Sequence, residues 1–180
     1  MIGEKGSGTR QSSAGTRAQF WRVSLDGLDF TMRHPQIVVF ENDNLLARQL
    51  QETATAHAWL LRESRQTPAC LKLLRGGGPS VLVLRVGRDL RRELSFLDDV
   101  HAQTPDIPII VVGNAENPAL QSLAYELGAT FVLFPPSPRQ QLGELTEHAL
   151  QAAMERMRGM AISDDMPREL NPETPHELDS

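Results

Sequence analysis

The sequence predicts an α/β protein with a doubly wound, five-stranded parallel sheet, and three observations support this fold class. From His34 onward, short apolar runs alternate five times with amphipathic stretches, which is the rhythm of strands that alternate with helices. With 180 residues, of which 40% are hydrophobic, the chain is long enough for one folded domain and some tail. Pro135 and Pro136 directly follow the last apolar run. Proline cannot donate to a sheet ladder, so the pair is expected where a strand ends, at the mouth of the sheet.

Each of the five units joins an apolar run to a helix start. Strands are expected over residues 36–41, 58–64, 80–86, 107–113 and 130–134. The following helices are expected to begin at capping or first-turn residues, namely Asn42, Asp43 and Asn44, then Thr67 and Pro68, Asp89, Asn117 and Pro118, and a capping box at 137–140. Gly128 is expected to end the fourth helix, and the fifth helix is expected to continue to about residue 157.

Residues 20–33 are expected to form a β-hairpin before the first of these units. Asp26-Gly27 separates two alternating runs, and a type I′ turn needs the positive φ that such residues tolerate. Pairing across the turn places six apolar side chains on one face: Trp21, Val23, Leu25, Leu28, Phe30 and Met32. A lone two-stranded hairpin is marginally stable in water, so this face is expected to cover the chain's own domain. The alternative is a ribbon that binds a partner.

Both ends of the chain have the composition of disordered tails around a domain of residues 35–160. Residues 1–19 are rich in Gly, Ser, Thr and Arg. Residues 161–180 hold six acids and one arginine, a net charge of −5 that equals the net charge of the whole chain. This acidic tail is expected to be solvated, and the alternative is a docking peptide.

The five-unit region resembles the receiver domain of bacterial response regulators, which has a flavodoxin-like fold. The resemblance covers residues 36 to about 158 and is carried by "PSVLVLR" for the central strand, "DIPIIVV" for the fourth and "LGATFVLFPP" for the fifth. It implies the receiver topology and a pocket at the mouth of the sheet. Residues of this chain stand at the positions of the family's pocket as follows: Glu41 and Asn42 at the acidic pair, Arg85 at the phosphoacceptor aspartate, Gly113 at the hydroxyl residue, Val132 at the switch aromatic, Pro135 at the lysine and Pro136 at the proline.

These replacements predict a degenerate pseudo-receiver that cannot be phosphorylated. Aspartyl phosphorylation needs a carboxylate nucleophile and a Mg²⁺ ion held by carboxylates. Arg85 supplies no nucleophile, and its positive charge repels the metal. Because the first and third strands are neighbours in receivers, Arg85 is expected to pair with Glu41 or Asp43 as a fixed cation in place of Mg²⁺.

Three functions are compatible with this pocket. The first is a phosphorylation-independent signalling module that acts by binding another protein or by dimerising. The second is a domain that binds a small anion or metabolite through Arg85, in the space around Glu41 and Gly113. The third is a working phosphoacceptor that uses displaced acids such as Glu41, Asp43 or Asp89.

The resemblance implies that a contact surface lies on the fourth helix, the fifth strand and the fifth helix. The residues expected there are Leu120, Tyr125, Val132, Arg139, Glu144 and His148. This surface would hold a second copy of the chain, as a homodimer, or another protein.

Several other kinds of site are not expected. Asp89 and Glu93 are interleaved with Arg85, Arg88, Arg91 and Arg92, so this arginine group is interpreted as a solvated helix face and not as a nucleic-acid site. No His, Cys or acidic spacing predicts a metal site, no cofactor or enzymatic activity is expected, and Cys70 is expected to be a buried, inert thiol. Neither a membrane span nor a signal peptide is recognisable, which predicts a cytoplasmic protein without membrane contact.

Overall fold

The computed structural model describes residues 20–25, 28–135 and 141–164, and for residues 20–33 and 161–164 only the course of the backbone. It divides into two units, residues 1–33 and residues 34–180. The first unit holds strands β1 (Phe20–Leu25) and β2 (Leu28–Arg33), which pair antiparallel. Their register sets Trp21 opposite Met32, Val23 opposite Phe30 and Leu25 opposite Leu28, which confirms the pairing expected from the sequence. The turn residues 26–27 lie outside the described residues.

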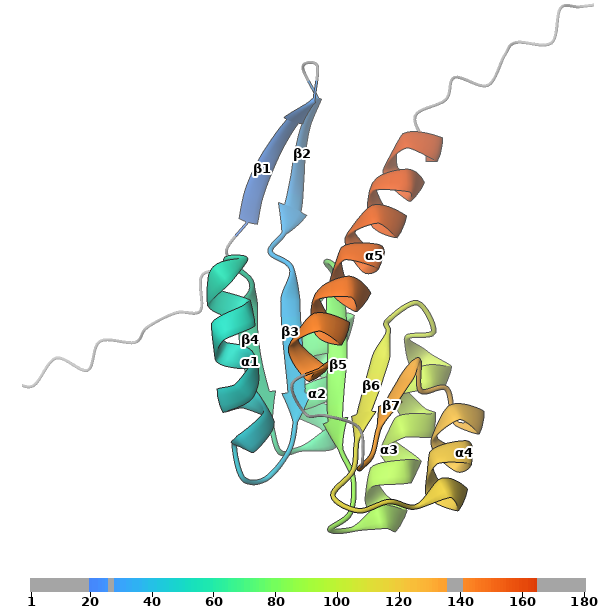
Figure 1. Ribbon diagram of the computed structural model, residues 1–180. Helices are drawn as coiled ribbons and strands as arrows, with labels where there is room; N and C mark the ends of the chain where they lie inside the picture. Colours follow the sequence, from blue (N-terminus) through green and yellow to red (C-terminus); the bar gives the residue numbers. More distant parts are fainter. Residues whose placement is uncertain (1–19, 26–27, 136–140, 165–180) are drawn as a thin grey trace, which may run out of the picture. The chain divides into compact units, whose positions relative to one another are not determined.

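The second unit is built on a five-stranded parallel sheet, which confirms the predicted fold class. Its strand order is β4-β3-β5-β6-β7 (Figure 1). The strands are β3 (Gln36–Phe40), β4 (Leu60–Ser64), β5 (Ser80–Arg85), β6 (Ile109–Val112) and β7 (Phe131–Leu133). The order reverses between β3 and β5, and in such sheets that switch point is where functional sites collect.

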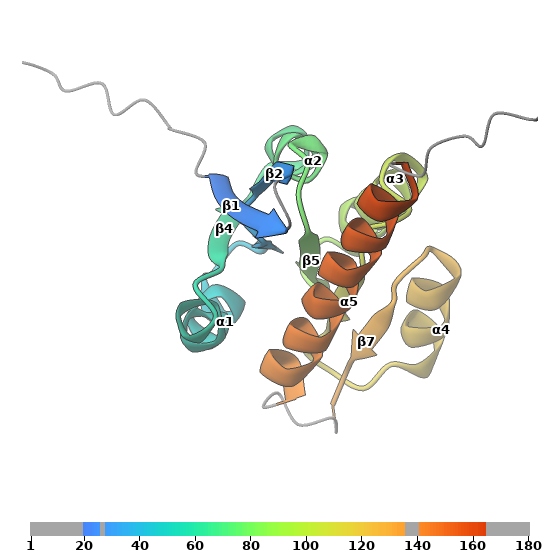
Figure 2. The same cartoon turned by 90° about the horizontal axis from the view of Figure 1, so that it is seen from above.

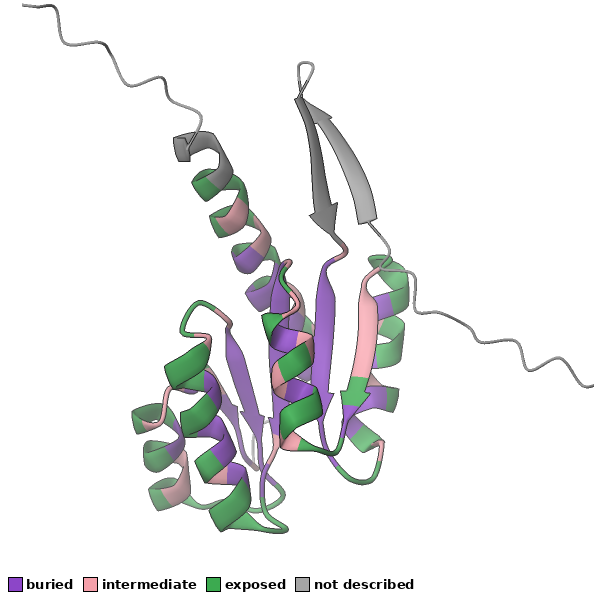
Figure 3. Cartoon of the chain, turned by 180° about the vertical axis from the view of Figure 1, so that it is seen from behind, coloured by how far each residue is buried: buried purple, intermediate pink, exposed green. Residues whose placement is uncertain are grey.

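Five helices cover the two faces of this sheet. They are α1 (Leu45–Ala56), α2 (Thr67–Arg75), α3 (Leu90–Gln103), α4 (Pro118–Glu126) and α5 (Gln141–Asp164). Helices α1 and α5 lie on one face, and α2, α3 and α4 on the other (Figure 2). Successive strand residues enter opposite cores: Val38 packs toward α2 and α3, whereas Ile37 and Val39 pack toward α1 and α5. The central strands are therefore buried from both sides (Figure 3).

The boundaries differ from the expected ones mainly at β4 and α5. Strand β4 begins at Leu60 and not at Ala58, because Ala58 has a positive φ of 54° and the Trp59 amide bonds to the Ala54 carbonyl at 2.9 Å. Helix α5 continues to Asp164, about two turns beyond the expected end. The expected capping box at 137–140 lies outside the described residues.

Helix ends otherwise follow the sequence signals. The Asp89 carboxylate accepts a hydrogen bond from the Arg92 amide (3.3 Å), and the Asn117 side chain accepts one from the Leu120 amide (3.0 Å). Gly128, directly after α4, adopts a positive φ of 96°, as a residue that ends a helix often does. Within the described part of the chain, no helix has both the length and the apolar character that crossing a bilayer requires.

Candidate functional site at the carboxyl edge of the sheet

The loops that follow β3, β5 and β6 surround a cavity at the carboxyl edge of the sheet. Its volume is about 280 Å³, and both apolar and polar residues line it. The lining residues are Phe40, Glu41, Asn42, Asp43, Arg85, Val86, Gly87, Arg88, Glu93 and Asn114. Three of the positions implicated by the receiver resemblance, Glu41, Asn42 and Arg85, are thus brought together.

Glu41 is a buried carboxylate that caps helix α1. Its side chain is 1% exposed and accepts hydrogen bonds from the amides of Leu45 (3.1 Å), Leu46 (3.0 Å) and Ala47 (2.8 Å). The sequence indicated residues 42–44 as the helix start, but Asn44 has a φ of 58° and makes no capping hydrogen bond through its side chain. Glu41 therefore satisfies the first-turn amides that Asn44 leaves free.

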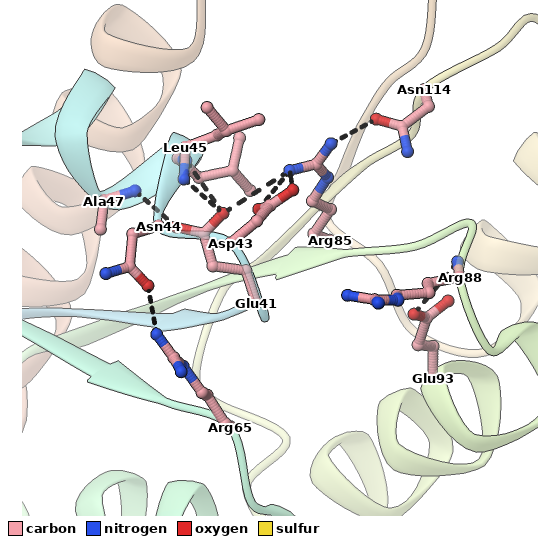
Figure 4. Close-up of polar contacts among 11 residues, drawn as sticks. Glu41, Asp43, Asn44, Leu45, Ala47, Arg65, Arg85, Arg88, Glu93 and Asn114 are labelled. Atoms are coloured by element: carbon pink, nitrogen blue, oxygen red, sulfur yellow. Dashed lines mark hydrogen bonds and ion pairs between the residues drawn. The ribbon is translucent and has the colours of Figure 1, made fainter.

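The Arg85 guanidinium lies beside Glu41 and Asp43, with Asn114 on its other side (Figure 4). One terminal nitrogen, Nη1, contacts both carboxylate oxygens of Asp43 and lies 3.9 Å from Oε2 of Glu41. The other, Nη2, donates to Oδ1 of Asn114 at 2.9 Å. The pairing of Arg85 with Asp43 and Glu41 confirms the contact expected from the sequence. Asn114 was missed, although its place two residues after the end of β6 was a signal, because the carboxyl ends of neighbouring parallel strands meet at one edge.

The charge of Arg85 influences the ionisation of Asp43. Desolvation at the rim acts to raise the pKa of Asp43. The positive charge of Arg85, together with side-chain and backbone hydrogen bonds, outweighs this effect and holds the pKa below its ordinary value of 3.8. Asp43 is therefore a carboxylate at neutral pH, paired with a guanidinium that cannot lose its proton.

The receiver resemblance places Gly113 at the position of the family's hydroxyl residue. The space into which a side chain at this position would extend is filled by Phe134. A Cβ atom on Gly113 would lie 2.4 to 2.9 Å from three atoms of the Phe134 ring, closer than such contacts allow. Phe134 is 4% exposed and belongs to the core beneath α3. The space in which a hydroxyl side chain would stand is thus core volume, which no local pattern indicates because the two residues are 21 positions apart.

The two prolines stand just after β7. Strand β7 ends at Leu133, so Pro135 lies beyond the hydrogen-bonded ladder, where the sequence placed it, and it is half-buried. Pro136 lies outside the described residues.

The interpretation of the α3 start as a solvated face is wrong for Glu93. Glu93 is 6% exposed, and its carboxylate accepts hydrogen bonds from the amides of Gly87 (2.8 Å) and Asp89 (3.1 Å). It turns inward because the amides before the helix need acceptors. Arg88, Arg91 and Arg92 are exposed, as expected, but the expectation is wrong for Arg85, which ends β5 with its side chain 17% exposed.

These residues do not fit a magnesium site. The Glu41 and Glu93 carboxylates are occupied by backbone amides, and Asp43 is occupied by Arg85. In the described ranges, no three His, Cys, Asp or Glu residues are grouped so that they could hold a metal ion. The displaced acids considered from the sequence, Glu41, Asp43 and Asp89, are all engaged in these caps and pairs.

The residues expected on a contact surface have different environments. Tyr125 on α4 is 47% exposed, and Glu144 and His148 on α5 are also exposed. Leu120 is half-buried against the core. Val132 is only 7% exposed and packs in the core on the α4 side, so its side chain is wrong as a surface residue. Arg139 lies outside the described residues. Leu123, 38% exposed on α4, was missed.

Cys70 is fully buried in α2, as expected, and burial raises the pKa of its thiol to about 12. The thiolate, which is the nucleophilic form, is therefore scarce at neutral pH.

No protein-family model matches the chain, and a search of curated proteins finds no significant match. The solved structures to which the chain is similar include response regulators and receiver domains. The response regulator StyR aligns with a TM-score of 0.60 at 20% identity, over 73% of this chain and 66% of that one. NtrX from Brucella abortus aligns with a TM-score of 0.56 at 17% identity, over 73% of this chain and 29% of that one. A CheY-like receiver domain protein from Methanospirillum hungatei aligns with a TM-score of 0.55 at 12% identity, over 68% of this chain and 98% of that one.

These similarities show that the chain has the receiver fold. It spans 66% of the StyR chain and 29% of the NtrX chain, so the activities of those longer proteins are not carried over with the fold.

Proposed function

We propose that this chain is a cytoplasmic, receiver-like signalling module that is not an enzyme and acts by binding another protein or a second copy of itself, without phosphorylation. The single observation that carries the proposal is the position of Arg85. Arg85 ends β5, where the receiver resemblance expects the phosphoacceptor carboxylate, and its guanidinium is paired with Asp43 and Glu41. A receiver-like domain that lacks a nucleophile can still act through its surfaces, by binding another protein or a second copy.

The alternative, a domain that binds a small anion through Arg85, receives less support from the geometry. Arg85 is 17% exposed, and its two terminal nitrogens already contact Asp43 and Asn114. An incoming anion would have to displace the Asp43 carboxylate and lie close to Glu41, whose charge would repel it.

The first test of the proposal is chemical phosphorylation of the full chain. The chain is incubated with acetyl phosphate and Mg²⁺, and its intact mass is measured. We expect no phosphoryl adduct. If an adduct forms, treatment with hydroxylamine distinguishes an acyl phosphate, which it removes, from other adducts. A hydroxylamine-sensitive adduct would contradict the proposal and revive the displaced-acid hypothesis.

The second test concerns the proposed contact surface, formed by α4, β7 and α5. Edge strand β7 lies between the two helices (Figure 2). The double variant Tyr125→Ala/Glu144→Lys removes an exposed aromatic residue and reverses an exposed charge. We expect it to weaken self-association in sedimentation, or partner capture in pull-downs, by at least tenfold while the melting temperature stays near that of the parent.

A matched control uses Leu45, which begins α1, and Glu63 on β4, the edge strand opposite β7. Leu45 is 45% exposed and Glu63 is exposed, so Leu45→Ala/Glu63→Lys makes the same kind of change elsewhere. If the control weakens association as much as the first variant, or if neither changes it, the surface on α4, β7 and α5 is not the interface.

A further inference from the structure

One side chain connects the carboxyl ends of three neighbouring strands. Arg85 ends β5, Asp43 lies in the loop after β3, and Asn114 lies in the loop after β6. The guanidinium contacts the Asp43 carboxylate on one side and the Asn114 amide oxygen on the other (Figure 4). Because β3, β5 and β6 are adjacent in the sheet, this residue ties together the loops on both sides of its own strand.

The same guanidinium is the positive charge nearest to two carboxylates. Its Nη1 atom contacts Asp43 and lies 3.9 Å from Oε2 of Glu41, which is itself 1% exposed. The Glu41 and Asp43 carboxylates both lie close to this atom, and two carboxylates so close together repel each other when no cation neutralises them. Arginine provides that cation permanently, since its proton is not lost at any accessible pH.

We propose that Arg85 is the resident cation of this pocket: it neutralises Glu41 and Asp43 and latches the loops after β3, β5 and β6, so that the pocket keeps one conformation without any divalent metal. The inference rests on the proposed function, and it deepens that function by explaining why the pocket keeps one conformation. In this view Glu41 and Asp43 form a cation site that the chain fills with its own Arg85. A carboxylate at position 85 would set three carboxylates close together and would release Asp43 from the guanidinium, so that the carboxylates at positions 43 and 85 could offer the oxygen ligands that Mg²⁺ and Mn²⁺ prefer.

The decisive experiment is metal rescue of Arg85→Asp in the full chain. Melting temperatures of the parent and the variant are compared in a chelator and in about 10 mM MgCl₂. In the chelator we expect the variant to melt about 5 °C or more below the parent, because three carboxylates then face one another. In MgCl₂ we expect the variant to recover most of this loss, while the parent stays unchanged.

Arg65→Asp is the matched control. Arg65 lies after β4, is exposed, and donates to the Asn44 side chain at 2.7 Å without contacting a carboxylate. The substitution changes the net charge by the same amount in a loop at the same edge of the sheet. We expect MgCl₂ to leave its melting temperature unchanged, so that rescue of Arg85→Asp reports the acid pair and not a general effect of salt.

Arg85→Met provides a second measurement if Arg85→Asp does not fold. Methionine keeps an unbranched stem but removes the charge and the hydrogen bonds. By hydrogen exchange we expect the amides of residues 42–44 and 114–116 to exchange at least tenfold faster than in the parent. The Leu46 and Ala47 amides should change little, because they bond to Glu41 and not to Arg85.

The latch is wrong if MgCl₂ stabilises the parent as much as Arg85→Asp, because the acids would then bind metal despite the guanidinium. It is also wrong if Arg85→Asp gains no more from the metal than Arg65→Asp, or if Arg85→Met leaves both loops as protected as in the parent. None of these outcomes depends on phosphorylation or on a partner, so the latch and the proposed function can fail separately.

Discussion

At the scale of single residues, Gly113 and Phe134 form a closely packed pair just beyond the ends of β6 and β7. The Phe134 ring occupies the volume into which any side chain at position 113 would project. The ring is buried and lies in a core that contains Phe40 and Phe96, which are themselves in contact with ring centroids 4.4 Å apart. Substitution of Gly113 alone by a larger residue would therefore clash with this packed ring.

We expect Gly113→Thr, which restores a hydroxyl residue, to destabilise the fold by about 1–3 kcal/mol through overpacking. Phe134→Ala alone should cost roughly 3–5 kcal/mol through the cavity that it leaves. In the double variant the threonine should cost much less, because the ring is gone, and urea unfolding of all four proteins measures this coupling. Gly159→Thr is the control, since a Cβ there meets no atom within 4 Å. Additive effects of the two substitutions would contradict the contact.

Asp43 gives the pocket a specific pH dependence. Its pKa is lower in the folded chain than its ordinary value of 3.8, so its pairing stabilises the fold fully above that value. As the pH falls through the lower, folded pKa, this contribution is lost. Asp43→Asn should therefore lower the free energy of unfolding at neutral pH by about 0–1 kcal/mol, as for a largely exposed pair. The difference from the parent should shrink below pH 3.8. A difference that instead grows toward acid pH in urea titrations would contradict the pairing.

At the scale of elements, two helices of the pocket are capped by buried glutamates. Glu41 precedes α1 and reaches forward to its first-turn amides, whereas Glu93 lies inside α3 and reaches back to the amides of Gly87 and Asp89. Both carboxylates stand near the positive ends of helix dipoles, which favour negative charge. The acids at this edge thus support the loops that carry Asp43 and Arg88.

We expect Glu41→Ala to destabilise the fold by about 1–3 kcal/mol, because the amides of Leu45, Leu46 and Ala47 lose their acceptor in a largely buried place. Glu41→Gln should cost less, since one acceptor oxygen remains. The control Glu52→Ala, at an exposed position of α1, should stay within about 0.5 kcal/mol of the parent in urea unfolding. Equal effects of Glu41→Ala and Glu52→Ala would show that the cap contributes nothing.

At the scale of the whole molecule, the chain consists of a hairpin unit and a receiver-fold unit. The register of the hairpin sets Trp21 opposite Met32 and Val23 opposite Phe30. The sequence predicts that these apolar side chains share one face, and a two-stranded hairpin with such a face needs a cover.

We expect removal of residues 1–33 to lower the melting temperature of the remaining domain, on the proposal that the hairpin face covers that domain. Each large apolar side chain that is fully buried contributes roughly 1.5–3 kcal/mol. Thermal unfolding of the full and shortened chains measures the effect. An unchanged melting temperature, together with lost capture of a partner, would instead assign the hairpin to partner binding.

The sequence by itself determined the features that depend on local pattern. Alternation predicted the five strands and five helices, Asp26-Gly27 predicted the hairpin register, and Asp89 and Asn117 predicted two helix caps, because periodicity and capping are properties of neighbouring residues. It also predicted the pairing of Arg85 with Asp43 and Glu41, since parallel neighbouring strands bring their carboxyl ends together whatever the details of packing.

Only the tertiary structure decided how the remaining side chains are used. Glu41 turns toward the amides of α1, Glu93 turns inward, Asn114 joins Arg85, and Val132 is buried and not a surface residue. Phe134 fills the space beside Gly113. Each outcome depends on which polar group lacks a partner or which volume is unfilled once distant segments have packed together. A one-dimensional pattern contains no measure of either quantity.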